Sequence, residues 1–477
     1  MSSLYDLIEA RFLTDALPAL SSYIEIPCIS PSYDPEWRKT GAIEEAIEQL
    51  SAWAKARRIP GLSVEIQRPD DRSPAIVIDI PAAAGGLGTA LLYGHLDKQP
   101  PLGDWAEGLD PFRAVRRDDR LYGRGGADDG YAIFAALGAI EALSATAAPH
   151  GRLLILIEAS EESGSPDLEA HLDLLSTRLD AVDLVICLDS GALDYERLWV
   201  TTSLRGNIGI TLEVAVLEHG IHSGEGGGVV PSSFRILRQL LDRIEDAETG
   251  EMLLDELSAQ PPEHHLAAAA QLSTELHDPL ASHFPTLSGV QLMGRDGADR
   301  LVRQSWSAAL AVTGIDGAPS TDDAGNVLRA STCVKLSIRL PPNVDAVLAQ
   351  DAVIAVLVTD PPSGATITAT PETPAQGWVA PAPARWLADA LDEASDVGFG
   401  HRPGFLGEGG SIPFLAELAK RLPQAQLVAT GLLGPGSNAH GPDEMLHIPT
   451  TIALTTALAS LLTAHGGRSA AERAAQP

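Results

Sequence analysis

Several short apolar runs in this chain end beside a histidine or a carboxylate, and this arrangement limits the possible folds more than any other feature. The runs read as buried strands and cover residues 75–80, 89–93, 153–158 and 184–188. A helical pattern fills residues 131–143, between the second and third runs. Strands that alternate with helices predict an α/β domain with a mixed, mostly parallel sheet flanked by helices.

A second α/β domain is expected inside the first, because 477 residues are too many for one ordinary core. After Thr202 the continuous apolar runs give way to a different pattern. The elements expected there are a half-exposed strand at 207–216, an amphipathic helix at 232–244 and a strand at 334–340. The expected boundaries are 1–201 and 376–477 for the first domain and 202–375 for the inserted one. Residues 246–330 show no clear period and receive no assignment.

Further elements are predicted at both ends of the chain. Residues 4–21 read as a helix that Pro18 should bend or end. The second half of the first domain should contain helices at 386–394 and 412–422 and a strand at 426–430.

Charge and cysteine content limit the partners and the compartment. The chain has 33 basic and 64 acidic residues, a formal charge of −31, which repels phosphate backbones and anionic lipid. We therefore expect neither nucleic acid nor a membrane as a partner, and no apolar stretch approaches transmembrane length. Cys28, Cys187 and Cys333 are isolated and odd in number, which favours a reducing compartment. Without an apolar signal core at the N-terminus, the predicted location is cytoplasmic.

His95 and Asp97 lie two residues apart at the end of the run 89–93, so their side chains can face the same side. One interpretation makes His95 a metal ligand and Asp97 the acceptor of its other ring proton. The alternative is an ordinary hydrogen-bonded loop pair.

Asp128 and Asp129 follow a glycine-rich turn and precede the helix at 131–143. Glycine permits backbone angles that let a carboxylate reach into a crevice, and a carboxylate has the two oxygens that a bridging ligand needs. An aspartate at this place can also cap the helix.

Four further residues complete an ordered set. Glu161 and Glu162 follow the run 153–158, so one carboxylate could bind metal while the other takes a proton; the alternative is a solvated acidic turn. Asp189 leaves a buried strand, where a charge is costly unless it is paired or bound to metal. His440 lies in a loop rich in turn residues, which more often serves function than packing. Five possible ligands and one free carboxylate, in this order, are what a two-metal hydrolase needs.

The inserted domain offers one histidine of interest. His222 is followed by Ser223-Gly224 and three glycines. From a second domain it could donate a hydrogen bond to the oxygen charge that develops on a substrate. The alternative is an exposed loop histidine.

These segments resemble the M20 family of metallopeptidases, in particular its dipeptidase branch of cytosolic nonspecific dipeptidases and carnosinases. The motifs that carry the resemblance lie at 94–100, 105–112, 121–125, 128–129, 161–165, 189–190, 222–224, 337–340, 408–413 and around His440. They cover most of the chain.

The resemblance implies a role for each matching residue. The implied metal ligands are His95 and Asp189 on one ion, Glu162 and His440 on the other, and Asp128 between them. The implied catalytic residues are Glu161 as general base, Asp97 as the residue that orients His95, and His222 as oxyanion donor. Arg339 is implied to pair with a substrate carboxylate, and Gly410 and Ser411 to line the cleft. The family also implies a homodimer formed through the lid domain, in which His222 completes the partner's site.

The sequence departs from the family pattern at two positions. The family's dipeptidases usually have arginine before the Glu-Gly-Gly motif and lysine after the paired aspartates, whereas Gly407 and Gly130 stand here. Both departures concern the substrate preference more than the reaction.

The resemblance thus implies hydrolysis of a small peptide with two divalent ions per chain. Zinc is the expected metal, and manganese and cobalt are the alternatives. The nearest alternative is an N-acyl amino acid deacylase with the same chemistry. Another is a noncatalytic metal-binding protein on this fold, although a pure binder has no need of Glu161. A phosphoesterase lacks basic residues near the motifs, apart from Arg124.

Overall fold

The computed structural model describes residues 3–281, 283–284, 286–410 and 413–474 and divides the chain into two compact units. Unit 1 contains Met1–Thr202, Ala380–Leu406 and Phe414–Pro477, and unit 2 contains Ser203–Val379 and Gly407–Pro413. The sequence prediction placed Gly407 in the first domain, whereas the structure places it in unit 2. The reason is packing, because Gly407 lies against Ser203 and Ser305 of that unit.

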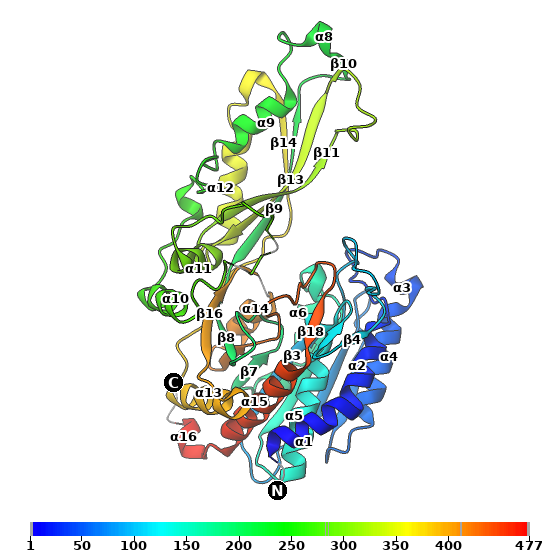
Figure 1. The fold of residues 1–477 in the computed structure, drawn as a ribbon, viewed down its shortest axis with the longest axis vertical. Coiled ribbons are helices and arrows are strands. Elements are labelled where there is room, and N and C mark those ends of the chain that lie inside the picture. Colours follow the sequence, from blue (N-terminus) through cyan, green and yellow to red (C-terminus); the bar gives the residue numbers. More distant parts are fainter. Residues whose placement is uncertain (1–2, 282, 285, 411–412, 475–477) are drawn as a thin grey trace. The chain divides into compact units, whose positions relative to one another are not determined.

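The main sheet of unit 1 runs in the order β1-β2-β6-β3-β7-β17-β8. These strands span, in chain order, Ser63–Gln67 (β1), Ala75–Ile80 (β2), Thr89–His95 (β3), Arg152–Glu158 (β6), Leu184–Cys187 (β7), Trp199–Leu204 (β8) and Gln426–Ala429 (β17). The four central strands β6, β3, β7 and β17 are parallel, and the outer pairings are antiparallel. The predicted mixed, mostly parallel sheet is confirmed (Figure 1).

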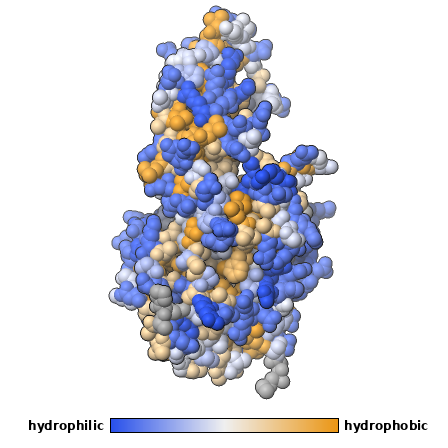
Figure 2. Space-filling view, turned by 90° about the vertical axis from the view of Figure 1, so that its left-hand side faces the viewer, coloured by the Kyte–Doolittle hydropathy of each residue, from blue (hydrophilic) through white to orange (hydrophobic). Residues whose placement is uncertain are grey.

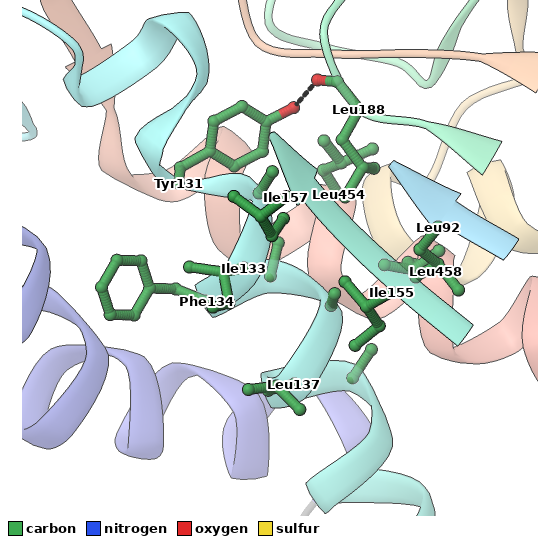
Figure 3. Close-up of a cluster of buried hydrophobic side chains, with 14 of the residues drawn as sticks. Leu92, Tyr131, Ile133, Phe134, Leu137, Ile155, Ile157, Leu188, Leu454 and Leu458 are labelled. Atoms are coloured by element: carbon green, nitrogen blue, oxygen red, sulfur yellow. Dashed lines mark hydrogen bonds between the residues drawn. The ribbon is translucent and has the colours of Figure 1, made fainter. Parts of the chain in front are cut away.

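One face of this sheet is covered by α5 (Ala132–Thr146) and α15 (Ile448–Gly467). Figure 3 shows Ile155 and Ile157 of β6 among side chains from both helices, including Leu137 and Leu458. All four side chains are almost fully buried. The continuous apolar run of β6 reflects a strand that is buried on both faces.

The opposite face of the sheet packs against α14 (Pro413–Arg421). Tyr93 of β3 stacks on Phe414 with ring centroids 3.5 Å apart and an interplanar angle of 16°. Its neighbour Leu92 belongs to the core that contains α5 and α15. Because successive side chains of a strand point to opposite faces, helices cover both sides of the sheet, as predicted.

Helix α15 has no counterpart among the predicted elements. It is 20 residues long, and by length and composition alone it is enough to cross a membrane, so the prediction that no stretch approaches this length is wrong. However, 78% of its most apolar window is buried inside the protein. It packs against α5, α13 (Arg385–Phe399) and α1 (Leu4–Arg11) as a core helix.

The N-terminal helical segment is longer than predicted. After α1, a π-helical turn at Phe12–Ala16 leads into α2 (Leu17–Ile24), so the segment continues past Pro18 and ends at Ile24, beyond the predicted residue 21. Pro18 lies in the first turn of α2, where its missing N–H does no harm.

A small sheet in the order β18-β5-β4 brings the C-terminal part of unit 1 next to an early loop. Its strands are Val115–Arg117 (β4), Arg120–Tyr122 (β5) and Met445–His447 (β18). Met445 pairs with Tyr122, so the loop before β18 lies beside the glycine-rich loop after β5. The remaining helices of unit 1 are α3 (Trp37–Thr40), α4 (Ala42–Lys55), α6 (Leu168–Leu174), α7 (Ser176–Leu179) and α16 (Ala470–Ala474).

Unit 2 contains an antiparallel sheet in the order β11-β13-β9-β14. The strands are Gly206–Ala215 (β9), Ala309–Asp316 (β11), Ser331–Leu340 (β13) and Thr366–Pro371 (β14). Two helices, α9 (Ser233–Leu241) and α12 (Ala346–Val358), pack on this sheet (Figure 1). The unassigned segment 246–330 contains α10 (Glu263–Glu275), α11 (Gly297–Trp306) and β11. Shorter elements are β10 (Ile221–His222), α8 (Ser223–Gly226) and β12 (Val327–Leu328).

The visible face in Figure 2 carries hydrophilic and apolar residues side by side. The chain has 64 acidic and 33 basic residues, an excess of negative charge that favours solubility.

Candidate metal centre

Two groups of possible metal ligands lie at the carboxyl end of the parallel strands in unit 1. In the first group, Nε2 of His95 lies 3.3 Å from Oδ1 of Asp128 and 3.8 Å from Oδ2 of Asp189. In the second, Nε2 of His440 lies 3.0 Å from Oδ2 of Asp128 and 3.3 Å from Oε2 of Glu162. Asp128 thus presents one oxygen to each histidine. The structure brings together all five residues that the sequence analysis named as ligands.

The geometry of both groups fits a pair of divalent ions. In a tetrahedral site with ligand bonds of about 2.0–2.2 Å, neighbouring ligand atoms lie roughly 3.3–3.6 Å apart. The four contacts measured here fall between 3.0 and 3.8 Å. Three carboxylates and two imidazoles also suit zinc, manganese or cobalt.

Parallel pairing explains why several of these side chains meet. His95 is the last residue of β3, and Asp189 follows the neighbouring strand β7 by two residues. The hydroxyl of Tyr131 donates a hydrogen bond to the carbonyl of Leu188, which fixes this end of β7 (Figure 3). On the other side of β3, strand β6 leads into the short 3-10 turn Glu161–Ser163. Ligands at the carboxyl ends of neighbouring parallel strands converge on one edge.

The paired aspartates have different surroundings. Both lie in the buried turn Gly126–Gly130 before α5, and the peptide bond between Asp128 and Asp129 is cis. Asp128 faces both histidines, whereas Oδ2 of Asp129 accepts the main-chain N–H of His95 at 3.3 Å. One aspartate is therefore available to metal, and its neighbour secures the end of β3.

His440 is held in a loop with unusual backbone angles. Its φ is +65° and that of Asn438 is +50°, a region that residues other than glycine seldom adopt. Its side chain is 55% exposed, more than those of the other ligands. Burial lowers the pKa of His440, but the hydrogen bond with Asp128 outweighs it and raises the pKa to about 9. The loop therefore directs an accessible imidazole toward the buried Asp128.

Asp97 contacts His95 through both its main chain and its side chain. Nδ1 of His95 lies 3.0 Å from the main-chain carbonyl of Asp97 and 3.6 Å from its carboxylate. The carboxylate also accepts the main-chain N–H groups of Glu161 and Glu162, at 3.1 and 3.0 Å. The orienting role of Asp97 stays a prediction, and its side chain in addition fixes the turn that carries the two glutamates.

Glu161 belongs to neither ligand group, although it lies in the same turn as Glu162. Burial, together with the nearby charge of Asp189, raises the pKa of Glu161 well above its usual value. Burial and Asp128 raise the pKa of Glu162 to about 8. Burial also raises the pKa of Asp128, but hydrogen bonds from the two histidines outweigh it and hold that pKa below its usual range. Crowded buried carboxylates of this kind are stabilised by a cation between them.

Two residues that support the turn have no role in the sequence prediction. Nε2 of Gln99 donates to Oε2 of Glu162 at 2.7 Å. Glu158, at the end of β6, accepts hydrogen bonds from Tyr93, from Ser165 at 2.8 Å and from Ser160 at 3.3 Å. A carboxylate in a buried run is costly without partners, and this signal could have pointed to Glu158.

The other predicted site residues lie in unit 2 or outside the described residues. His222 is exposed in β10, and its Nδ1 accepts the N–H of Gly224 at 3.1 Å. Gly410 is exposed, and a Cβ there would meet no atom within 4 Å. Ser411 lies outside the described residues. The roles of these three residues stay predictions.

Arg339 of β13 lies near a second arginine that the sequence analysis missed. Burial lowers the pKa of Arg339, and burial together with Arg339 lowers the pKa of Arg205 to about 10. Arg205 donates to the carbonyls of Ser307 at 3.0 Å and Gly409 at 3.3 Å. Two guanidinium groups therefore lie close enough to affect each other in a partly buried place of unit 2.

Packing explains both departures from the family pattern. A Cβ at Gly130 would collide with the ring of Tyr23, and one at Gly407 would lie 2.6 Å from Oγ of Ser203. No lysine or arginine side chain can start at these positions without rearrangement. Arg124, the one basic residue that suggested a phosphate clamp, forms a fully buried ion pair with Glu444.

Comparisons with known proteins find relatives that match this chain over most of its length. The chain is 27% identical over 413 residues to a cysteinylglycine-S-conjugate dipeptidase of Corynebacterium striatum, which covers 85% of this chain and 87% of the relative. Among solved structures, the dipeptidase Dug1p of Saccharomyces cerevisiae superposes with a TM-score of 0.78 at 23% identity, and human carnosine dipeptidase 1 with 0.79 at 20%. Each comparison covers 98% of both chains.

The family assignment rests on a longer match. The model of peptidase family M20/M25/M40 matches residues 91–464, a span that begins in β3 and ends in α15. It contains both ligand groups and Glu161. The chain therefore belongs to peptidase family M20/M25/M40 and is a metallopeptidase.

Proposed function

We propose that this chain hydrolyses the peptide bond of dipeptides or small peptides with two divalent ions, and that Glu161 is the general base. The similarity to a cysteinylglycine-S-conjugate dipeptidase and to carnosine dipeptidase 1 supports the substrate class. The observation that carries the proposal is the position of Asp128, whose two oxygens face His95 and His440 separately.

The proposed mechanism assigns a separate task to each carboxylate. Asp128, with Asp189 on one side and Glu162 on the other, would hold the ions together with the two histidines. Bound there, such ions lower the pKa of water and polarise a carbonyl oxygen. Glu161 takes the proton of the attacking water and passes it to the leaving amine. Asp97 keeps this base in place through the main-chain N–H of Glu161.

Residues of unit 2 would complete the reaction. His222 donates a hydrogen bond to the oxyanion of the tetrahedral intermediate, from the partner subunit of a homodimer. Arg339 pairs with the terminal carboxylate of the substrate, and Gly410 and Ser411 line the cleft. The planar, bidentate guanidinium of Arg339 supports the carboxylate assignment.

We further propose zinc as the native metal, with manganese and cobalt as functional substitutes, and a cytoplasmic location. The mixed nitrogen and oxygen donor set supports zinc. Cys28, Cys187 and Cys333 are free thiols, which supports a reducing compartment.

The first experiment measures hydrolysis of free dipeptides and matched N-acetylated dipeptides by metal-stripped protein, before and after addition of zinc, manganese or cobalt. We expect metal-dependent cleavage of the free dipeptides alone. Cleavage of only the acetylated substrates would make the chain a deacylase, and no cleavage of either set would contradict the proposal.

The second experiment tests the base. Glu161→Gln should bind two metal ions like the unmodified chain but lose nearly all turnover, because the amide cannot accept the proton. Glu25→Gln, the same change at an exposed position, serves as the control. Substantial turnover by the Glu161 variant would remove this residue from the base role.

A further inference from the structure

A buried ion pair lies directly behind the metal centre. Nη1 of Arg124 lies 2.6 Å from Oε2 of Glu444, and the two side chains are 1% and 0% exposed. The residues are 320 positions apart in the chain. An ion pair withdrawn from water in this way stabilises little by itself, because desolvation offsets the attraction. The role of the Arg124–Glu444 pair must therefore be read from the other hydrogen bonds that these two side chains form.

The second oxygen of Glu444 holds the turn that carries Asp128. Oε1 accepts the main-chain N–H groups of Gly125, Ala127 and Asp128, at 3.0, 3.2 and 3.3 Å. These N–H groups belong to a buried turn, where unpaired donors would be costly. The carboxylate of Glu444 therefore determines where the backbone of Asp128 lies.

The same pair also holds the loop that carries His440. Nη2 of Arg124 donates to the carbonyl of Gly441, next to His440 in the chain, at 2.7 Å. The carbonyl of Glu444 accepts the N–H of Gly123 at 3.0 Å. The two loops are thus joined through both members of the pair and through the main chain.

We propose that Arg124 and Glu444 are positioning residues that set the spacing between Asp128 and His440, and through it the affinity of the second ligand group for its ion. This inference rests on the proposed two-metal function. The Oδ2 of Asp128 and Nε2 of His440 lie 3.0 Å apart, and each belongs to a loop that the pair holds. Residues behind metal ligands commonly contribute about tenfold to a hundredfold in metal affinity.

The inference predicts unequal effects on the two ions. Asp128 belongs to both groups, but the other two members of the first group, His95 and Asp189, are placed by the ends of strands β3 and β7. The second group takes both Asp128 and His440 from the loops that the pair holds. Weakening the pair should therefore leave one ion tightly bound and release the other.

The test is a zinc titration of metal-stripped full-length protein by competition with a chromophoric chelator. The first variant is Glu444→Gln, which keeps the side-chain volume and one acceptor oxygen. The second is Arg124→Lys, which keeps the positive charge but loses the second nitrogen that donates to the carbonyl of Gly441. Arg152→Met is the control, because it removes an arginine from an ion pair with Asp79 that lies at the other end of β6.

We expect unmodified protein and the control to bind two zinc ions tightly. Both variants should bind one ion within about threefold of normal and the other about tenfold to a hundredfold more weakly. Excess zinc should restore kcat, and KM for a dipeptide measured at saturating zinc should stay unchanged. A purely structural role would lower Tm without this rescue.

Three results would overturn the inference: both ions bound normally by both variants, both ions weakened equally, or lost turnover that excess zinc does not restore. If Glu444→Gln fails to fold, the zinc titration of Arg124→Lys alone decides whether the inference holds. Failure of the unmodified chain to bind two ions would instead reject the proposed function, so the two failures are distinguishable.

Discussion

Gln99 donates a 2.7 Å hydrogen bond to the oxygen of Glu162 that also faces His440. The hydrogen bond from Gln99 holds the carboxylate of Glu162 in one orientation. In that orientation, Oε2 of Glu162 is the oxygen that faces His440. A ligand carboxylate that is held in this way loses less freedom when metal binds. A residue without metal-binding chemistry of its own therefore contributes to the site.

Replacing Gln99 by methionine should weaken zinc binding at the second ligand group by about tenfold to a hundredfold. The side chain keeps its length but can no longer donate to Glu162. Chelator competition measures the change, and addition of zinc should recover most of kcat. Equal zinc affinities for the variant and the unmodified chain would contradict this role.

Asp97→Asn should lower kcat by about tenfold to a hundredfold, with a smaller effect on KM. Both carboxylate oxygens accept main-chain N–H groups, from Glu161 and Glu162. An amide must turn an NH2 group toward one of these donors, which displaces the turn. Asp167→Asn is a suitable control, because Asp167 accepts the N–H of Ser73 at 2.8 Å outside both ligand groups. Normal kcat in the Asp97 variant would show that the turn is held by other contacts.

Arg339→Met should raise KM for free dipeptides by about tenfold to a hundredfold and leave KM for dipeptide amides nearly unchanged. Loss of a charged partner matters only for a substrate with a free carboxylate. Lys335→Met is the matched control, since Lys335 lies on the same strand and pairs with Glu372 at 2.7 Å. Equal changes in KM for both substrate types would argue against this carboxylate contact.

The stability of the metal-free protein should depend on pH through Glu158. Burial, aided by the charge of Asp97, outweighs the hydrogen bonds from Tyr93 and Ser165 and raises the pKa of Glu158 from 4.5 to about 7. Between these values the folded chain binds more protons at Glu158 than the unfolded chain, so stability falls as pH rises from about 4.5 to 7. The total effect is on the order of 3 kcal/mol.

Glu158→Gln removes this titration while keeping the shape of the side chain. Its Tm should therefore fall less steeply between pH 4.5 and 7 than that of the unmodified protein. Thermal unfolding of metal-stripped protein at several pH values measures this difference, with the exposed Glu169→Gln as control. Parallel curves for the Glu158 variant and the unmodified chain would disprove the contribution.

Gly130→Ala should destabilise unit 1 by about 1–3 kcal/mol, because the new methyl group collides with Tyr23 and lies 2.5 Å from the carbonyl of Gly125. Gly467→Ala, at the end of α15, meets no atom within 4 Å and serves as the control. Calorimetry should show a Tm lower by several degrees for the first variant only. An unchanged Tm would mean that Tyr23 can move aside.

The inner strands of the main sheet in unit 1 could be predicted closely from the sequence, whereas its outer strands β1 and β8 and the helix α15 were not predicted. β2 spans the predicted residues, and β3, β6 and β7 differ from their predictions by one or two residues at an end. Their apolar runs are continuous because both faces are buried. In α15, polar residues such as Thr455 and Thr456 interrupt the apolar pattern. Each donates its hydroxyl to the carbonyl four residues earlier, so both can be buried in the helix.

The candidate site shows the same division. Ligands that follow strands, such as His95 and Asp189, were predicted because the sequence marks the strand ends. Glu444 was not, because its contacts involve residues more than 300 positions away, and nothing near it in sequence indicates them. The sequence linked Gly130 and Gly407 to the substrate preference, which stays a prediction, whereas their close packing against Tyr23 and Ser203 became visible only in the structure.

The order of the ligands along the chain has a consequence for protein synthesis. His95, Asp128 and Asp189 are all made before the inserted unit, whereas His440 is made 251 residues after Asp189. At about 5–20 residues per second, a ribosome needs roughly 13–50 s to cover that distance. During this time the first ligand group has all of its members, whereas the second has Asp128 and Glu162 but lacks His440. The second group can therefore be completed only after the inserted unit has been made.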